Sequence, residues 1–545
     1  MSKLPPDIGF VSSRRGFLKR GLGVGIGGLV AGCGRTVIGG SMGQSAGVGG
    51  LSGSGSTPEP PQPPEPPQPP EPPKPPEPPQ PPEPPTPPSN LQPTLTGSVS
   101  QVNATVTNVR IGSVGSDFVG FSFEKSEFTT RIFVAGNTNV VNLFKALGPC
   151  VIRIGGSAVE TQVWKPSGRG RNGGEIATVD IDAFAGFVAQ TPCRVIYGIN
   201  LSNPTDADAV AEAVYAVQKL GASLYAFSLG NEPRFNNGTY KASPYNDYAV
   251  LKAKWLARKT AILNALPMAK FVGVDGTDGN FAEVTKLFAN DFALNDIDLL
   301  TTHYYRFNDT ETFNVRNNVI SAASLIPPFL TVPDSKLVSL LGNMRTVTPT
   351  GKRFRITECN SATSGGIDGL SNVYSSALWA LDYMFTVAQG GSVGVNFHGG
   401  DNPSYAPFTF ANSSLTEVRP LYYAMLFFTM IGSGAVLSSS IDAGGQNISI
   451  YTIKTASGLS ILFVNKEVSQ SFEVSLQLPN SVSSATSVYL KGPGLSSKTG
   501  ISIQGREISG ITGTLGSYTS WFVPVSGNIA KVNVPALTAV LVKAS

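Results

Sequence analysis

The sequence predicts an α/β fold, in which a (β/α)8 TIM barrel is followed by an antiparallel β-sandwich. Two observations predict it. Between residues 116 and 412, short apolar runs rich in β-branched and aromatic residues alternate with longer segments of helical composition. From residue 413 onward the helical segments give way to alternating strands separated by turn residues. Eight strand–helix repeats in succession are typical of a parallel barrel ringed by helices.

The eight apolar runs begin with FVGFSFE and end with GVNFHGG. A doubly wound open sheet is the structural alternative, but its Gly-rich phosphate turn is missing, because FSFEKSEF follows the first run instead. The runs occupy residues 118–124, 151–156, 194–200, 224–232, 270–277, 299–305, 354–360 and 394–400.

The β-sandwich is predicted for residues 413–545, where NISIYTIK, SFEVSLQLPN and KVNVPALTAVLVK alternate polar and apolar residues. Residues 91–115 contain SVSQVNATVTNVRIGSV, which has the same alternation. We expect this segment to add a strand to the sandwich, although it precedes the barrel in the chain.

The N-terminal ninety residues are not expected to belong to the fold. Residues 1–33 contain a twin arginine, a short Gly-rich apolar run and VAGC, which resembles a twin-arginine export signal combined with a lipoprotein signal acylated at Cys33. A transmembrane anchor is the alternative, but the apolar run is too short to span a bilayer comfortably. Residues 34–57 form a Gly/Ser-rich linker and residues 58–90 a Pro-rich linker of polyproline II type. The sequence thus predicts an exported lipoprotein, membrane-anchored through Cys33 and facing the periplasm or the cell exterior.

Composition excludes several classes of function. A net charge of +4 on 545 residues gives no electrostatic case for nucleic-acid binding. The two histidines, His303 and His398, and the four cysteines lack metal-ligand spacing, so no metal and no cofactor is predicted. Both histidines are expected to be hydrogen-bonded residues that line the barrel.

Two glutamates stand at the ends of predicted barrel strands. Glu232 closes LYAFSLGNE and Glu358 closes FRITE, and the C-terminal strand ends of such a barrel converge on one mouth. An isolated surface glutamate is the ordinary interpretation of either residue alone. A facing pair, one protonated and one ionised, is what cleavage of a glycosidic bond requires.

These segments resemble glycoside hydrolase family 79, the β-glucuronidases and heparanase-like enzymes of clan A. SLGNEP is similar to the clan's strand-four Asn-Glu signature, and RITECNSATSGG is similar to its strand-seven nucleophile segment. FVGFSFE, IRIGG, HYY, GVNFHGG and RPLYYAMLFF extend the resemblance from about residue 100 to the C-terminus. It implies a retaining mechanism through a covalent glycosyl-enzyme.

The resemblance implies a role for each matching residue. Glu232 is the acid/base, Glu358 the nucleophile, and Asn231 the partner of the sugar 2-hydroxyl. Tyr304 is chosen as the residue that orients the nucleophile; two-residue alternation groups it with Thr302 and puts His303 and Tyr305 on the opposite face. The remaining implied sugar-binding residues are Glu124, for which a surface glutamate is the alternative, and Gly365, Gly366 and Tyr405, which match groups that bind a uronate carboxylate.

Two positions depart from the family pattern. Thr363 stands where relatives often carry a tyrosine, which puts a strict preference for glucuronate in doubt. Arg234 stands where an acidic residue is common, which affects the leaving-group side.

Several other residues carry structural expectations. Arg153 is interpreted as an ion-pair partner inside the barrel. Cys150 and Cys193 precede neighbouring strands, so a disulfide between them is a hypothesis. Cys359 is expected to be buried, and Trp164 and Trp379 are expected to pack in the core.

The predicted function is therefore an exo-acting β-glucuronidase that removes terminal glucuronic acid, or its 4-O-methyl form, from a glycan or glycoconjugate. A retaining clan A β-glycosidase acting on a neutral sugar is one alternative. A non-catalytic, glycan-binding surface lipoprotein is the other.

Overall fold

The computed structural model describes residues 90–202, 205–233, 247–308, 325 and 334–545. The predicted signal segment with Cys33, the linkers up to residue 89, and Arg234 lie outside these residues. No helix of the described chain is long and apolar enough to cross a membrane.

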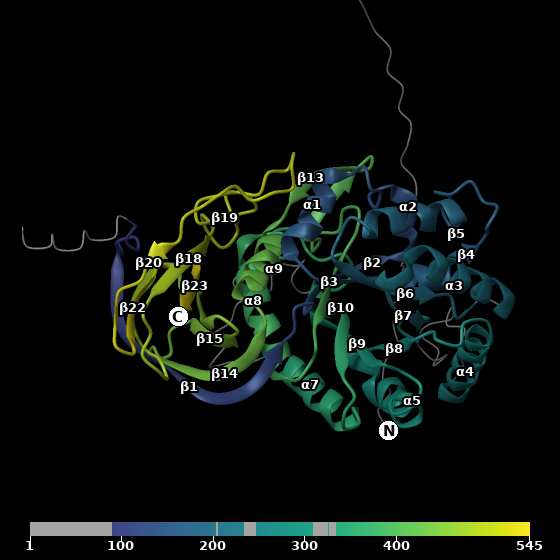
Figure 1. Ribbon diagram of the computed structural model, residues 1–545, viewed down its shortest axis with the longest axis horizontal. Helices are drawn as coiled ribbons and strands as arrows, with labels where there is room; N and C mark the ends of the chain where they lie inside the picture. Colours follow the sequence, from purple (N-terminus) through teal and green to yellow (C-terminus); the bar gives the residue numbers. More distant parts are fainter. Residues whose placement is uncertain (1–89, 203–204, 234–246, 309–324, 326–333) are drawn as a thin grey trace, which may run out of the picture. The chain divides into compact units, whose positions relative to one another are not determined.

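The barrel predicted from the sequence is confirmed. Eight parallel strands close on themselves in the order β10-β11-β2-β3-β6-β7-β8-β9, and helices surround them (Figure 1). All eight predicted apolar runs are barrel strands, and most of their residues are buried on both faces, as parallel strands covered by helices must be. The strands are β2 (Val119–Glu124), β3 (Cys150–Gly155), β6 (Cys193–Ile199), β7 (Leu224–Leu229), β8 (Phe271–Thr277), β9 (Leu299–Phe307), β10 (Phe354–Ala362) and β11 (Val395–Gly399).

A helix follows each barrel strand in the chain. Two of the connections between a strand and its helix each contain a small two-stranded sheet. The helices are α1 (Thr138–Leu147), α2 (Thr178–Val188), α3 (Asp206–Leu220), α4 (Tyr248–Ala265), α5 (Lys286–Phe292), α7 (Ser335–Val347), α8 (Tyr374–Gln389) and α9 (Pro420–Ile431). The small sheets pair β4 (Val163–Trp164) with β5 (Glu175–Ile176), and β12 (Phe408–Ala411) with β13 (Ser414–Val418).

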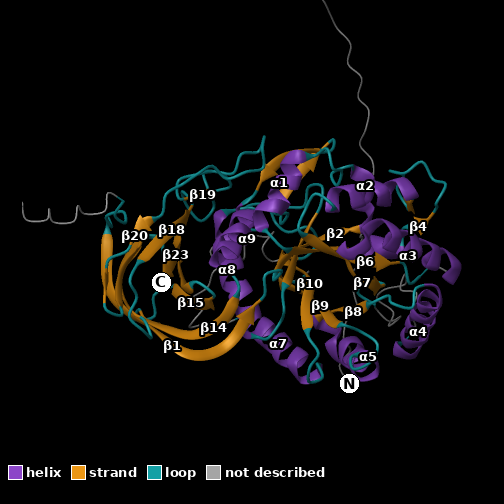
Figure 2. Cartoon of the chain, in the orientation of Figure 1, coloured by secondary structure: helices purple, strands orange, loops and turns teal. Residues whose placement is uncertain are grey.

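The predicted β-domain forms one continuous 11-stranded sheet that curls on itself (Figure 2). As expected, the segment before the barrel supplies a strand, β1 (Ser98–Val114), which pairs antiparallel with β14 and parallel with β17. The inner face of the curl holds its own apolar core. The other strands are β14 (Gly434–Asp442), β15 (Ile448–Thr455), β16 (Gly458–Asn465), β17 (Gln470–Gln477), β18 (Ala485–Lys491), β19 (Ser502–Ile503), β20 (Trp521–Phe522), β21 (Val525–Ser526), β22 (Ile529–Val534) and β23 (Thr538–Ala544).

Helix α8 packs between the barrel and the curled sheet. Its residues from Tyr374 to Ala388 are all buried, which is the pattern of a helix enclosed on every side. Buried Asp382 forms an ion pair of 2.8 Å with Lys466, and the single proton of the Tyr374 hydroxyl is shared between the Leu490 and Leu537 carbonyls, at 3.0 and 3.1 Å. The two parts therefore share a polar as well as an apolar interface.

Cys150 and Cys193 form the hypothesised disulfide. They are direct register partners where β3 and β6 begin, at the end of the barrel opposite its mouth. Cys359 is buried, which raises the pKa of its thiol to about 12, and Trp164 and Trp379 are buried in the core.

The disulfide is expected to contribute to stability through the unfolded chain. It spans 43 residues, so the Cys150→Ser/Cys193→Ser variant should lose about 4 kcal/mol of unfolding free energy. Equilibrium denaturation measures this loss. Thiol titration of the denatured wild type should find two additional thiols after reduction, and equal counts before and after would contradict the disulfide.

Candidate active site

The barrel interior changes from apolar to polar along its axis. A small cluster of Val151, Ile196, Ala226, Val272 and Leu299 fills the end at which the strands begin. Two residues further along β3 comes Arg153, which therefore faces the same interior. The interior toward the mouth is lined by charged and hydroxyl side chains, and these form the candidate site.

Glu358 reaches the interior because of an irregularity in β10. The register against β9 shifts between Ile356 and Glu358, and a shift of this kind lets two successive side chains face one side. Thr357 and Glu358 accordingly both point inward: the Thr357 hydroxyl donates to Asp275, and Glu358 accepts from Arg153 and Tyr305.

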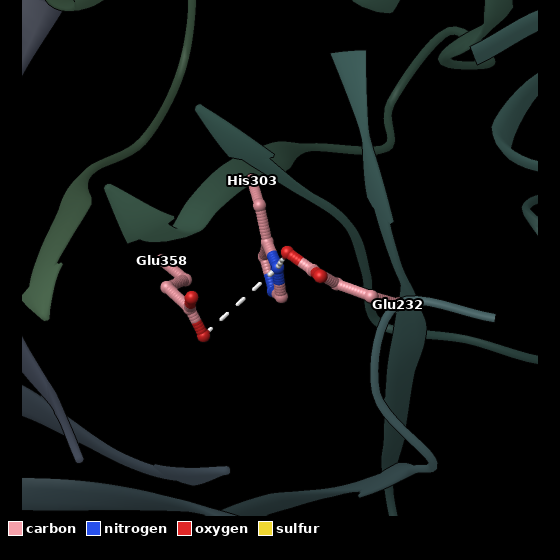
Figure 3. Close-up of side chains that lie close together, drawn as sticks. All are labelled: Glu232, His303 and Glu358. Atoms are coloured by element: carbon pink, nitrogen blue, oxygen red, sulfur yellow. Dashed lines mark hydrogen bonds and ion pairs between the residues drawn. The ribbon is translucent and has the colours of Figure 1, made fainter. Parts of the chain in front are cut away.

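Glu232 stands in the turn that follows β7. The residue has a φ of 42°, in the left-handed region, and its side chain is 18% exposed. His303 lies between Glu232 and Glu358, with Nδ1 3.0 Å from Oε1 of Glu232 and 4.0 Å from Oε2 of Glu358 (Figure 3). One oxygen of each carboxylate lies within 4.8 Å of an oxygen of the other. The two glutamates therefore face each other across one site, as the sequence argument requires.

Three partners besides His303 surround the Glu358 carboxylate. Arg153 donates to Oε2 at 2.8 Å, Tyr305 donates to Oε1 at 2.8 Å, and His398 Nδ1 lies 3.7 Å from Oε2. Burial raises the pKa of Glu358, but the charges of His398, His303 and Arg153 and the Tyr305 hydrogen bond outweigh it and lower the pKa to about 2. Glu358 is thus ionised at neutral pH, which is the state a nucleophile needs.

His303 is held as a cation. Burial lowers its pKa, but the charge of Glu358 and the contacts with Asp275 and Glu232 raise the pKa to about 9. The protonated ring can donate through Nδ1 to Glu232, while Nε2 lies 3.6 Å from Asp275.

Asp275 is the buried centre of the site, and sequence reasoning missed it. Its carboxylate accepts from Arg153 at 3.0 Å, Ser228 at 2.6 Å and Thr357 at 2.6 Å. Burial raises the pKa of Asp275, but the Arg153 charge and the His303 contact hold it well below its usual range. Asp275 has a φ of 54° and lies in a register shift of β8, and neither feature is visible in KFVGVDGT.

The prediction for Tyr304 is wrong. Its hydroxyl donates to Asp334, outside the barrel, and the residue that contacts Glu358 is Tyr305. Inward-facing Leu299 fixes the alternation of β9, so His303 and Tyr305 point inward and Tyr304 points toward the helices. The two-residue alternation of β9 was visible in the sequence, but the prediction assigned the wrong set of alternate residues to the barrel interior.

The other predicted residues gather around the same mouth. The interpretation of Arg153 as a barrel-interior ion-pair partner is confirmed, and it also donates to the Asn231 side chain at 2.6 Å. Glu124 accepts from the Ala158 amide at 2.7 Å and lies 3.6 Å from His398. Gly365 and Gly366 have left-handed φ values of 85° and 76°, and the Gly365 carbonyl accepts from the Tyr405 amide at 3.4 Å. Both histidines line the interior, as predicted: His303 contacts Glu232, and His398 contacts Ser122 at 3.0 Å.

A cation would have one donor set among the described residues, formed by Glu232, His303 and Glu358. A positive charge already lies beside this set, because the Arg153 guanidinium is 2.8 Å from Glu358. The arrangement therefore fits proton transfer and nucleophilic attack better than metal ligation.

No protein-family model matches the chain, and a search of curated proteins finds no match. Solved structures do resemble it. A 4-O-α-L-rhamnosyl-β-D-glucuronidase from Fusarium oxysporum has a TM-score of 0.63 at 20% identity, over 82% of this chain and 100% of its own. A family 51 arabinofuranosidase from Xanthomonas axonopodis pv. citri has a TM-score of 0.60 at 13% identity, over 82% and 100%. The bifunctional glucanase-xylanase CelM2 from a metagenome library has a TM-score of 0.56 at 13% identity, over 82% of this chain and 99% of its own. These glycoside hydrolases share the fold of this chain, and at such identities the likeness concerns the fold alone.

Proposed function

We propose that this protein is a retaining glycoside hydrolase of family 79 that acts as an exo-β-glucuronidase. The observation that carries the proposal is the pair of carboxylates, Glu232 and Glu358, with oxygens within 4.8 Å of each other. Retaining glycosidases hold their carboxyl groups about 5–5.5 Å apart, whereas inverting enzymes leave room for a water at about 6.5–9.5 Å.

The two steps use these residues as follows. Ionised Glu358 attacks the anomeric carbon while Glu232 donates its proton to the glycosidic oxygen, so the leaving alcohol departs and a glycosyl ester forms on Glu358. Glu232, now a carboxylate, takes a proton from water, whose oxygen attacks the same carbon and releases Glu358. Arg153 and Tyr305 hold the nucleophile, and Asn231 is the partner of the sugar 2-hydroxyl.

Three features support a uronic acid as the sugar. Gly365, Gly366 and Tyr405 match the groups that bind a uronate carboxylate in family 79. The Gly365 N–H has no hydrogen-bond partner among the described residues, so it is available to an anion. One of the structural neighbours is, by its own description, a glucuronidase. Thr363 is the feature that favours a neutral sugar instead.

A panel of 4-nitrophenyl β-glycosides tests the substrate. We expect kcat/KM for the glucuronide to exceed that for the glucoside, xyloside and galactoside by about 100-fold or more. The neutral sugars lack the carboxylate, so the groups of the site that bind it would be left unpaired. Faster hydrolysis of a neutral glycoside would refute the preference for a uronic acid and would be compatible with the retaining mechanism. Proton NMR should show the β-anomer as first product, and an α-anomer would refute retention.

Tyr305→Phe and Tyr304→Phe form a matched pair. Loss of the charge-assisted hydrogen bond to Glu358 should lower kcat/KM of Tyr305→Phe by about 10–100-fold. Tyr304→Phe loses only its Asp334 partner, so activity should stay within about threefold while thermal stability falls. Steady-state kinetics and melting curves on both variants check this, and the reverse ranking of activities would contradict the assignment.

The exported, lipid-anchored state is also proposed. The Cys150–Cys193 disulfide favours an oxidising compartment, in agreement with an export signal. Fractionation of cells that produce wild type or Cys33→Ser should find the variant released from the membrane fraction. Equal membrane association of both proteins would contradict acylation at Cys33.

A further inference from the structure

The turn that carries Asn231 and Glu232 is held in an unfavourable backbone conformation. Strand β7 ends at Leu229, Gly230 then has a φ of 81°, and Glu232 has a φ of 42°. A non-glycine residue in the left-handed region is strained and persists only where its surroundings impose that conformation. Groups outside the turn must therefore hold it.

Glu160 is the side chain that meets the turn from one side. It ends the short 3-10 helix Ser157–Glu160 that follows β3. Its Oε1 accepts from the Asn231 N–H at 3.2 Å, and its Oε2 accepts from the Ser202 N–H at 2.8 Å and from the Ser202 hydroxyl. One carboxylate thus ties together the loops after three neighbouring barrel strands, β3, β6 and β7.

The sequence of the turn is adapted to this contact. A Cβ on residue 230 would lie 2.8 Å from Oε1 of Glu160, so a side chain there would displace the Glu160 carboxylate, and the φ of 81° favours glycine as well. Two groups hold the turn from the other side. The Glu232 N–H donates to the Asp275 carbonyl at 3.0 Å, and the Asn280 side chain donates to the Pro233 carbonyl at 3.0 Å.

We propose that Glu160 is a positioning residue for the acid/base Glu232. This inference rests on the proposed function. Glu160 contacts the backbone of the turn and Ser202, and through these contacts it sets where the Glu232 carboxyl stands relative to the glycosidic oxygen. Loss of Glu160 should impair protonation of the leaving group and leave attack by Glu358 largely intact.

The test uses two aryl glycosides of whichever sugar the wild type hydrolyses best. Phenoxide needs protonation to leave, whereas 2,4-dinitrophenolate does not. In Glu160→Ala, kcat/KM for the phenyl glycoside should fall about 10–100-fold, the scale of a misplaced catalytic group. The dinitrophenyl glycoside should lose less than about fivefold, because its cleavage bypasses the acid. Glu160→Gln keeps one acceptor oxygen at the same length and should fall between wild type and alanine.

Glu175→Gln is the matched control. Glu175 lies in the same connection between β3 and α2, but its carboxylate contacts Lys165 and Asn172 at the surface, so both substrates should be hydrolysed as by wild type. Equal losses on both leaving groups in the Glu160 variants, or no loss on either, would overturn the positioning role. A wild type that hydrolyses none of the aryl glycosides would instead contradict the proposed function.

A crystal structure of Glu160→Ala gives a readout that is independent of turnover. A displaced Glu232 carboxylate supports the proposal, and an unmoved turn overturns it. Should the alanine variant fail to fold, the glutamine variant carries the same comparison in kinetics and structure.

Discussion

Glu358→Gln is expected to abolish glycoside turnover, lowering kcat by about four orders of magnitude or more. An amide of the same size cannot form the glycosyl ester, whereas its one oxygen can still accept one of the two hydrogen bonds that Arg153 and Tyr305 donate to the carboxylate. Binding of the glycone should therefore change much less than turnover. Steady-state kinetics measures the first quantity, and calorimetric titration with a non-hydrolysed thioglycoside measures the second.

A covalent trap adds a direct readout for the same residue. A 2-deoxy-2-fluoro glycoside with a good leaving group should label wild type on the peptide that contains Glu358 and should leave Glu358→Gln unlabelled. Glu473→Gln, a change in strand β17 of the curled sheet, is the control and should be labelled like wild type. Turnover by Glu358→Gln at the wild-type rate would refute the nucleophile assignment.

Arg153→Met is expected to have the largest effect on stability, with a loss of about 3–5 kcal/mol in the free energy of unfolding. The guanidinium is fully buried and pairs with Asp275 at 3.0 Å and with Glu358 at 2.8 Å. Methionine fills much of the space but leaves these buried carboxylates without their shared cation. Denaturant titration at neutral pH measures the loss.

The pH dependence of this variant has a definite sign. The pKa of Glu358 in the folded protein, about 2, lies below its ordinary 4.5, so its ionised form stabilises the fold. That contribution is present above pH 4.5 and is lost as the pH falls toward 2. Without Arg153 the pKa values of Glu358 and Asp275 rise, because its charge lowers both. Arg153→Met should therefore lose less stability than wild type as the pH falls from 4.5 toward 2, so the difference in unfolding free energy between the two proteins should narrow at acid pH.

Arg194→Met is the matched control for the same substitution. Arg194 is 46% exposed and pairs with Asp117 at the surface, where such pairs contribute about 0–1 kcal/mol. Comparable losses in the two variants would contradict the role assigned to the Arg153 network.

The strands of the barrel were predictable because each is a continuous apolar run bounded by turn residues. Glu232 and Glu358 were predictable for a related reason, since position at a strand end is a property of the sequence. Asp275 and Tyr305 were not found by the same reasoning. Their placement depends on which face of β9 points inward and on register shifts in β8 and β10, and such shifts are set by tertiary pairing.

Glu160 illustrates a second limit of sequence reasoning. In GGSAVETQ it stands among small and polar residues with no periodic pattern. Its partners, Ser202 and Asn231, are 42 and 71 residues away. Only the closed barrel brings these loops together, so no local signal marks the residue.

The position of β1 has a consequence for biosynthesis. This strand is made before the barrel, yet it lies in mid-sheet between β14 and β17, which are made after it. Until residues 434–477 have left the ribosome, β1 lacks both neighbours and exposes two unpaired edges, which are templates for association with other chains. Chaperone binding or rapid completion of the chain must therefore prevent β1 from pairing with other chains during synthesis. A chain truncated after the barrel would contain β1 without its strand partners and should be prone to aggregate.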